Sequence, residues 1–262
     1  MWDSLIITPF INVLLFIYTL VWKNFGIAIV LFTILIRLVT YPLSRSQLKG
    51  AAAMQDLQKD KRWIEMQKKY KNNKEQLAQE QMKLYKELGI NPLSSCLPTL
   101  IQFPIIIGLY QSIIRSLAST PIQLLELTSH IYPGLLSVSS LIPLNSRFLW
   151  MDLGQPERLV LPFLPFGIPV LAVIVVVTTY LQSKMMTPAS ASPDDQGAQM
   201  SRMMSLYMPF LMGYLALTLA SGLSLYFVIS NLLGILQYAV MGKVDWKSLL
   251  PGAKAKPATI KK

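Results

Sequence analysis

Five long apolar stretches constrain this sequence more than any other feature. Each is long enough to cross the hydrocarbon core of a lipid bilayer, which is about 30 Å thick. They cover residues 26–43, 95–115, 160–181, 203–219 and 222–241. Hydrophobic residues make up 53% of the chain and charged residues only 14%, against about a quarter in an average soluble domain. The pattern predicts an all-α membrane protein with five transmembrane helices.

Residues 4–22 form a further apolar segment, which carries a stripe of polar side chains. The polar positions recur at spacings of four or seven residues and are Ser4, Thr8, Asn12, Thr19 and Lys23. A polar stripe on an otherwise apolar helix is typical of segments that lie in the membrane interface. We therefore predict an N-terminal interfacial helix. A sixth span is the alternative, but only residues 23–25 would then remain to turn the chain.

The basic residues are distributed unevenly between the apolar stretches. Segment 44–90 carries eleven, segment 184–202 carries two and the tail 243–262 carries six of the 24 lysine and arginine residues. Cytoplasmic loops of membrane proteins are enriched in lysine and arginine. These three segments, and with them the C-terminus, are therefore predicted to be cytoplasmic, and the N-terminus is predicted to lie outside. Basic cytoplasmic segments also attract anionic lipids.

The first basic segment has the periodicity of helices rather than of a linker. One weakly amphipathic helix is predicted from Leu48, Ala52, Trp63, Met66 and Tyr70, and a second from Leu77, Leu84, Tyr85 and Leu88. The pair Asn72-Asn73 separates them, which predicts a cytoplasmic helical hairpin over residues 46–88. This hairpin is inserted in a membrane domain over residues 1–242, with the basic tail after it. Residues 187–199 are expected to form a flexible loop.

Four sequence motifs carry a resemblance to a known family. They are IRLVTYPLSRSQLKGAAAMQDLQ at 36–58, LYKELGINPLSSCLPTLIQFPIIIGLY at 84–110, FLWMDL at 148–153 and SGLSLYFVISNLLGILQ at 221–237. These motifs resemble those of the YidC-type insertases, a family that includes mitochondrial oxidase-assembly and chloroplast Albino relatives. They occur in the order and near the spacing of the family. The resemblance covers residues 1–242.

The resemblance implies a membrane protein insertase and chaperone. Such proteins insert and fold nascent membrane proteins, alone or beside the Sec translocon, without ATP or a cofactor. The basic hairpin and tail are candidate docking elements for ribosomes, targeting factors or anionic lipids, and DNA is not expected as a partner because these basic residues flank apolar spans. The bacterial plasma (inner) membrane is the expected location, since no organellar presequence is visible; a processed organellar protein is the alternative.

Arg37 is the leading candidate for a functional residue. It lies inside the first predicted span, about 10 Å from Ser44 along a helix, where a buried arginine costs about 2.5–3.5 kcal/mol. One interpretation is that the side chain snorkels towards the cytoplasmic headgroups. The resemblance implies instead a water-filled groove open to cytoplasm and lipid. No Asp or Glu falls within the five predicted spans, so Arg37 is expected to attract an acidic segment of an incoming chain.

Four further residues are candidates for the lining of this groove. Thr33 precedes Arg37 by one helical turn and shares its face. The resemblance adds Gln182, which aligns with a groove glutamine of the family. It also adds Tyr226, the first member of an aromatic pair whose second member is Phe227 here. For Thr33 and Tyr226 the alternative is ordinary interhelical packing.

The fourth predicted span and the residues just before it carry four methionines, spaced four residues apart along one face. They are Met200, Met204, Met208 and Met212. Methionine surfaces adapt to varied partners, so this stripe is a candidate slide for diverse clients. Plain packing between helices is the alternative.

The sequence favours neither catalysis nor a bound metal or cofactor. Cys96 is the only cysteine, and no Cys/His cluster is present. An intramembrane protease built on Ser224 would need a general base nearby, yet the only histidine, His130, is predicted on an external loop. A small transporter or channel is the main alternative to an insertase. Against it stand the lack of membrane carboxylates and of visible internal repeats. A structural assembly subunit is a third option.

Overall fold

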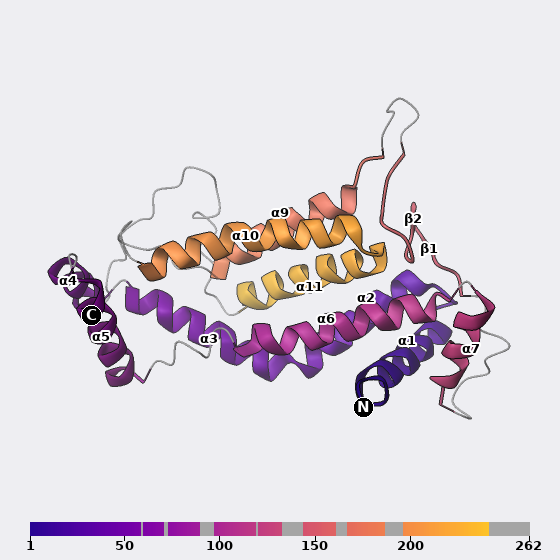
Figure 1. Ribbon diagram of the computed structural model, residues 1–262, viewed down its shortest axis with the longest axis horizontal. Coiled ribbons are helices and arrows are strands. Elements are labelled where there is room, and N and C mark those ends of the chain that lie inside the picture. The colour runs from indigo at the N-terminus through magenta and orange to yellow at the C-terminus, as the bar shows by residue number, and fades with distance from the viewer. Residues whose placement is uncertain are drawn as a thin grey trace. The chain divides into compact units, whose positions relative to one another are not determined.

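The structure, a computed structural model, is mostly helical, which confirms the predicted helical class (Figure 1). It describes residues 1–58, 60–70, 73–89, 97–118, 120–132, 144–160, 167–186 and 196–240. The elements in chain order are η1 (Asp3–Ile7), α1 (Thr8–Leu20), α2 (Phe25–Val39), α3 (Tyr41–Gln58), α4 (Lys61–Lys69), α5 (Lys74–Glu87), α6 (Leu97–Ser116), α7 (Pro121–Ser129), β1 (Arg147–Phe148), β2 (Met151–Asp152), α9 (Val170–Met186), α10 (Gln196–Thr218) and α11 (Ser221–Val240). η1 is a π-helical turn that continues into α1.

The chain divides into two compact units, each built from segments that are distant in sequence. Unit 1 contains Met1–Thr40, Ile101–Thr178 and Phe210–Leu233, and unit 2 contains Tyr41–Leu100, Thr179–Pro209 and Gly234–Lys262. The predicted basic tail lies outside the described residues, as do residues 187–195 of the predicted flexible loop. That prediction is wrong at its end, because α10 already begins at Gln196.

Two helices in the described part of the chain are long and apolar enough to cross a membrane. They are Asp3–Leu20 and Ser221–Val240, and the broken pair Phe25–Val39 and Tyr41–Met54 makes a third if it is counted as one span. The helices Val170–Met185 and Ser205–Thr218 are apolar but shorter. The arrangement with five spans therefore stays a prediction.

In unit 1, α1 packs along α2 in the opposite direction. The ring of Phe10 lies 5.2 Å from that of Phe32, and the ring of Tyr18 lies 5.9 Å from that of Phe25, between centroids. The chain reverses between the two helices within residues 21–24, where Trp22 and the next residue adopt positive φ angles of 49° and 57°. A turn of four residues is enough to reverse the chain here. The shortness of this segment therefore does not argue against a span by residues 4–22. The location of α1 in the membrane interface stays a prediction.

The polar stripe predicted on the N-terminal helix does not face water at its centre. Asn12 is only 2% exposed. Its side-chain amide donates to the carbonyls of Thr8 and His130, both at 2.7 Å, and its Oδ1 accepts from the N–H of Tyr132 at 2.8 Å. By contrast, the apolar residues Leu5 and Leu20 are 72% and 64% exposed. Part of the polar stripe is thus covered by residues 130–132, and the exposed surface of α1 includes side chains suited to contact with lipid.

Replacing Asn12 with leucine is expected to destabilise unit 1 by about 1–3 kcal/mol. Leucine has a similar shape but leaves the partly buried carbonyl of His130 and N–H of Tyr132 without their partner, and unsatisfied groups of this kind cost up to that much. The loss should appear as a lower melting temperature and as faster proteolysis within residues 120–132. Thr19→Ala, which removes an exposed hydroxyl from the same helix, is the control. Equal effects of the two variants would contradict this account of Asn12.

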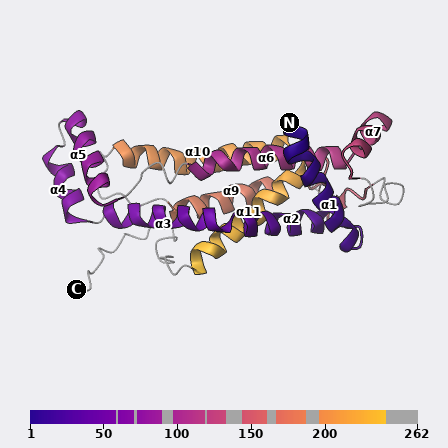
Figure 2. The ribbon, with the colours of Figure 1, turned by 90° about the horizontal axis from the view of Figure 1, so that it is seen from below.

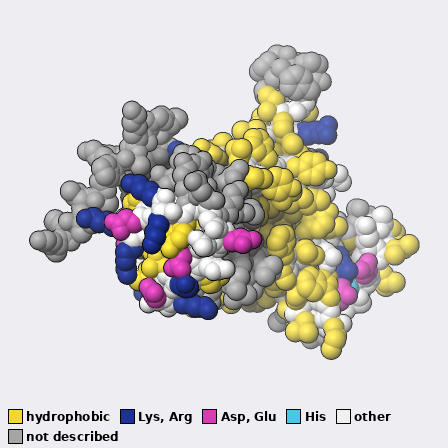
Figure 3. Space-filling view, turned by 60° about the vertical axis from the view of Figure 1, so that its left-hand side comes forward, with side chains coloured by type: hydrophobic (Ala, Val, Ile, Leu, Met, Phe, Trp, Pro, Cys, Tyr) yellow, Lys and Arg dark blue, Asp and Glu magenta, His cyan; other side chains and the backbone are white. Residues whose placement is uncertain are grey.

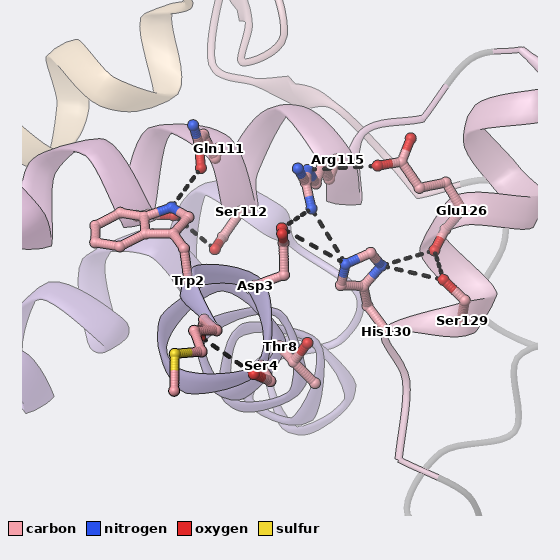
Figure 4. A network of polar contacts seen from close by, with 12 residues as sticks. Trp2, Asp3, Ser4, Thr8, Gln111, Ser112, Arg115, Glu126, Ser129 and His130 are labelled. Carbon is pink, nitrogen blue, oxygen red and sulfur yellow. Dashed lines mark hydrogen bonds and ion pairs between the residues drawn. The ribbon is translucent and has the colours of Figure 1, made fainter.

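A cluster of charged side chains holds the start of η1 against α6 and α7 (Figure 4). Nη1 of Arg115 donates to Oδ1 of Asp3 at 2.6 Å and lies 3.1 Å from Nε2 of His130, while its Nε lies 3.6 Å from Oε1 of Glu126. Figure 3 shows a small group of acidic and basic side chains, with the histidine in cyan among them, beside a largely hydrophobic surface. Exposed ion pairs contribute about 0–1 kcal/mol, so the cluster orients these helices more than it stabilises them.

The motif FLWMDL forms the two-stranded ribbon β1–β2 and packs under the start of α11. Phe148 pairs with Met151, and the chain turns through residues 149–150 between them. The backbone carbonyl of Leu153 accepts from the N–H of Gly222 at 3.0 Å, and that of Gln155 accepts from the N–H of Ser221 at 2.8 Å. Because the first N–H groups of a helix have no partner within it, the ribbon segment acts as a cap for α11.

In unit 2, the first helix predicted for the hairpin is broken into α3 and α4. Asp60 interrupts it and caps α4, because its Oδ1 accepts from the backbone N–H of Arg62 at 2.8 Å. Asn73 caps α5 in the same way, through the N–H of Gln76 at 3.2 Å. Figures 1 and 2 show α4 and α5 side by side, and the Trp63 ring lies 5.6 Å from that of Tyr85. The cytoplasmic location of this helix pair stays a prediction.

Replacing Asp60 with alanine is expected to reduce the stability of α4 by about 1 kcal/mol, the typical value of an N-cap. The hydrogen bond from the Arg62 N–H lowers the pKa of the Asp60 carboxyl. The charge-dependent part of the cap is therefore present above about pH 4 and is lost as the pH falls through the lowered pKa. Amide exchange across residues 61–69 measures the effect, with Asp60→Asn as a control that keeps an acceptor. Unchanged exchange in the alanine variant would contradict it.

Candidate functional site

The candidate site is built around the C-terminal end of α2. The first span was predicted over residues 26–43, but α2 ends at Val39 and a new helix begins at Tyr41. Arg37 therefore lies in the last turn of α2 rather than deep inside a continuous helix. The unpaired carbonyls at a helix C-terminus carry a partial negative charge, which favours a cation at this position. Thr40 closes the helix by donating its hydroxyl to the carbonyl of Ile36 at 2.8 Å.

The Arg37 guanidinium is bound to Ser230 of α11. Its Nη2 donates to the backbone carbonyl of Ser230 at 2.6 Å and to the hydroxyl oxygen at 2.7 Å, and its Nε donates to the same hydroxyl at 3.0 Å. Three hydrogen bonds thus join two helices that lie 193 residues apart in the sequence. The charged group points at the neighbouring helix, an arrangement that differs from snorkelling.

Two further polar side chains extend this contact to α6. The amide nitrogen of Gln102 donates to the hydroxyl oxygen of Tyr226 at 2.5 Å, and Tyr226 lies one helical turn before Ser230 on the same face of α11. All four residues belong to unit 1. Arg37, Ser230, Tyr226 and Gln102 therefore form a polar network on one face of α11, whose hydrogen bonds reach α2 and α6.

The network contains a positive charge but no negative one. Within the described ranges of the chain, no carboxylate forms an ion pair with Arg37. A guanidinium stays protonated even when it is partly buried. The neutral hydroxyl and carbonyl of Ser230 satisfy part of its hydrogen-bonding capacity without cancelling its charge. The site can therefore attract a negatively charged group.

The other residues predicted for the groove have different surroundings. Thr33 is fully buried, and its hydroxyl donates to the carbonyl of Ile29 in its own helix at 2.6 Å. Phe227 is buried in the apolar core of unit 1, with its ring 5.8 Å from that of Tyr226. Gln182 is half-buried on α9 and belongs to unit 2. Of the other predicted groove residues, only Tyr226 belongs to this network.

Two of the four side chains in the predicted methionine stripe of α10 are described by the structure. The side chains of Met200 and Met204 lie outside the described residues, Met208 is half-buried, and Met212 packs against the core of unit 1. The large apolar side chains that are exposed on this helix are Met203, Leu206, Tyr207, Phe210, Tyr214 and Leu217. The client slide on the methionine stripe stays a prediction, and the structure reveals a second apolar face beside it.

Two members of the network, Ser230 and Gln102, were not identified from the sequence. Both lie within the motifs quoted for the family resemblance. Ser230 follows Tyr226 by four residues and therefore shares its helical face, which is the signal that the sequence contained. Nothing in the sequence shows that Gln102 faces Tyr226, because that contact depends on the packing of two distant helices.

These features define the class of this protein: a helical membrane protein that holds a charged side chain between two of its helices. Comparison with known proteins then gives the family. The chain belongs to the family of the 60Kd inner membrane protein, whose sequence model matches residues 16–247. The resemblance inferred from the four motifs is confirmed.

The relatives of this chain are named as insertases rather than as a class of enzyme. The chain is 33% identical over 248 residues to the membrane protein insertase MisCA of Bacillus subtilis (strain 168), covering 94% of this chain and 81% of that protein. It is 31% identical over 259 residues to the membrane protein insertase YidC 2 of Bacillus anthracis, covering 97% and 86% of the two chains. These relatives are bacterial membrane proteins.

The fold is similar to that of a solved structure, described as an active YidC insertase crystal structure with the first transmembrane domain resolved. The TM-score is 0.55 and the sequence identity is 28%. The match covers 92% of this chain and 46% of the solved chain, so this chain spans less than half the length of that protein.

Proposed function

We propose that this protein inserts and folds transmembrane segments of other membrane proteins, without ATP, through a hydrophilic groove open to cytoplasm and lipid. The family supports the general role. The observation that carries the mechanism is Arg37, which is partly buried, bound by neutral groups and without a carboxylate partner in the described part of the chain.

The proposed mechanism begins with electrostatic attraction. An acidic stretch in the translocated tail of a client is drawn towards the guanidinium, because opposite charges interact more strongly where water is partly excluded. Water in the groove would shorten the hydrocarbon barrier that the polar tail must cross. The apolar span of the client would then move sideways into lipid, where its burial is favourable. No bond is made or broken in this scheme.

The proposed topology follows the distribution of basic residues. We place the N-terminus outside and the C-terminus in the cytoplasm, with five spans between them, in the plasma membrane of a bacterium. The helix pair α4–α5 would then face the cytoplasm. Its basic side chains make it the candidate docking element for ribosomes, targeting factors or anionic lipids, and the Sec translocon is a candidate partner in the membrane.

Reconstitution of the purified protein into proteoliposomes tests the proposal. A small single-span client with an acidic tail is added, and its insertion is scored by protection of the tail from protease. We expect insertion in the absence of ATP, and none in empty liposomes beyond the spontaneous level. Solute flux is measured in the same vesicles. Flux without client insertion would overturn the proposal in favour of a transporter or channel.

A further inference from the structure

The guanidinium of Arg37 is bound along one of its two hydrogen-bonding edges. Nε and Nη2 both donate to Ser230, as described above. The third nitrogen, Nη1, makes no hydrogen bond to the residues that the structure describes. The N–H groups of Nη1 are therefore left to donate to another acceptor.

The Ser230 hydroxyl lies among other polar side chains. Its oxygen accepts two hydrogen bonds from Arg37, and Tyr226 lies one helical turn away on the same face of α11. Gln102 holds that tyrosine from α6. Ser230 thus belongs to a polar network that includes residues of three helices.

We infer that Ser230 is a positioning residue, which keeps the Arg37 side chain turned towards α11 and presents its Nη1 to an acidic group of the client. Arginine has a long, flexible side chain with large rotational entropy, and near a membrane surface such a side chain extends towards the headgroups when nothing holds it. The three hydrogen bonds to Ser230 oppose that movement. The consequence for clients rests on the proposed function, whereas the positioning of Arg37 does not.

The first test measures the position of Arg37 directly. In protein labelled with ¹⁵N at arginine Nε, the Nε–H of Arg37 is assigned by comparison with Arg37→Lys. We expect its exchange with water to be slow in the native protein and about tenfold faster or more in Ser230→Ala, which removes the acceptor of this N–H. Ser230→Thr keeps the hydroxyl and should keep the exchange slow. Equal exchange in the native and alanine proteins would overturn the inference.

The matched control is Ser224→Ala. Ser224 is also a buried serine of α11, but its hydroxyl bonds to the carbonyl of Ala216 and not to Arg37. The control therefore loses a buried hydroxyl from the same helix and leaves the network intact. We expect the exchange at Arg37 Nε to stay at its native value.

The second test compares two clients that differ only in the tail, one acidic and one with each acid replaced by its amide. We expect Ser230→Ala to lower insertion of the acidic client about three- to tenfold, the range of one modest hydrogen bond, and to leave the neutral client unchanged. It should have no further effect in an Arg37→Ala background. Equal losses for both clients, matched by Ser224→Ala, would reveal a purely structural role and overturn the inference.

Failure of the proposed role of Arg37 and failure of the inference about Ser230 give different results. If Arg37→Ala leaves insertion of the acidic client unchanged, the proposed role of Arg37 is wrong, and the exchange measurement still decides whether Ser230 positions its side chain. If Arg37→Ala impairs the acidic client and Ser230→Ala does not, only the inference about Ser230 is overturned.

Discussion

Replacing Arg37 with glutamate is expected to lower the insertion of a client with an acidic tail by about tenfold or more. The substitution turns an attraction into a repulsion at a partly buried position, where two charges a few ångströms apart interact by several kcal/mol at an effective dielectric constant of about 20. A tenfold change in rate corresponds to only about 1.4 kcal/mol, so the estimate allows for strong screening by water.

The measurement is the rate of client insertion into proteoliposomes, with three versions of one client. The acidic tail should be impaired most, the neutral tail less, and a tail carrying lysines least of all, because the new carboxylate attracts it. Arg45→Glu is the control of equal charge change, since Arg45 is an exposed residue of α3. Undiminished insertion of the acidic client by Arg37→Glu would refute the proposed role.

Replacing Gly26 with valine is expected to destabilise unit 1 by about 3 kcal/mol. The Cβ of any larger residue at this position would collide with the ring of Phe148 in strand β1. Overpacking a close contact of this kind typically costs about 1–3 kcal/mol, and valine also lacks the helix preference that would partly compensate in alanine. The loss should appear as a lower melting temperature in detergent.

A second substitution distinguishes this explanation from a general intolerance of change in α2. Phe148→Ala removes the ring, so the double variant should be more stable than the sum of the two single effects implies. Gly154→Ala is the matched control, because a Cβ at Gly154 would meet only ordinary contacts of 3.5–3.9 Å. Strictly additive losses would show that the glycine is not needed for the approach of Phe148.

Most of the helical elements follow from local features of the sequence. The apolar blocks predicted α2, α6, α9, α10 and α11, although α9 begins only at Val170. The boundary before α5 follows from Asn73, whose side chain competes with the helix for backbone N–H groups and caps the next one. These features act over a few residues, so the sequence reports them directly.

The sequence predicted less well those side chains whose surroundings come from segments distant in the sequence. Asn12 was read as part of a polar surface, yet residues after α7 cover it and satisfy its amide. On α10, Met212 packs against the core of unit 1 and Phe210 is exposed, a difference that the spacing of the methionines does not show. Periodicity identifies the faces of a helix but does not say which of them meets a neighbouring helix.

The sequence by itself determined the class of this protein: long apolar blocks require helices in a bilayer, since only a helix or a closed barrel satisfies the backbone there. It also singled out Arg37, because burying a charged side chain within an apolar segment is costly in any arrangement of the helices. Only the tertiary structure decided what holds that charge. Ser230 is its partner because of the way in which α2 and α11 are rotated and packed against each other. Such packing depends on all the side chains between the two helices.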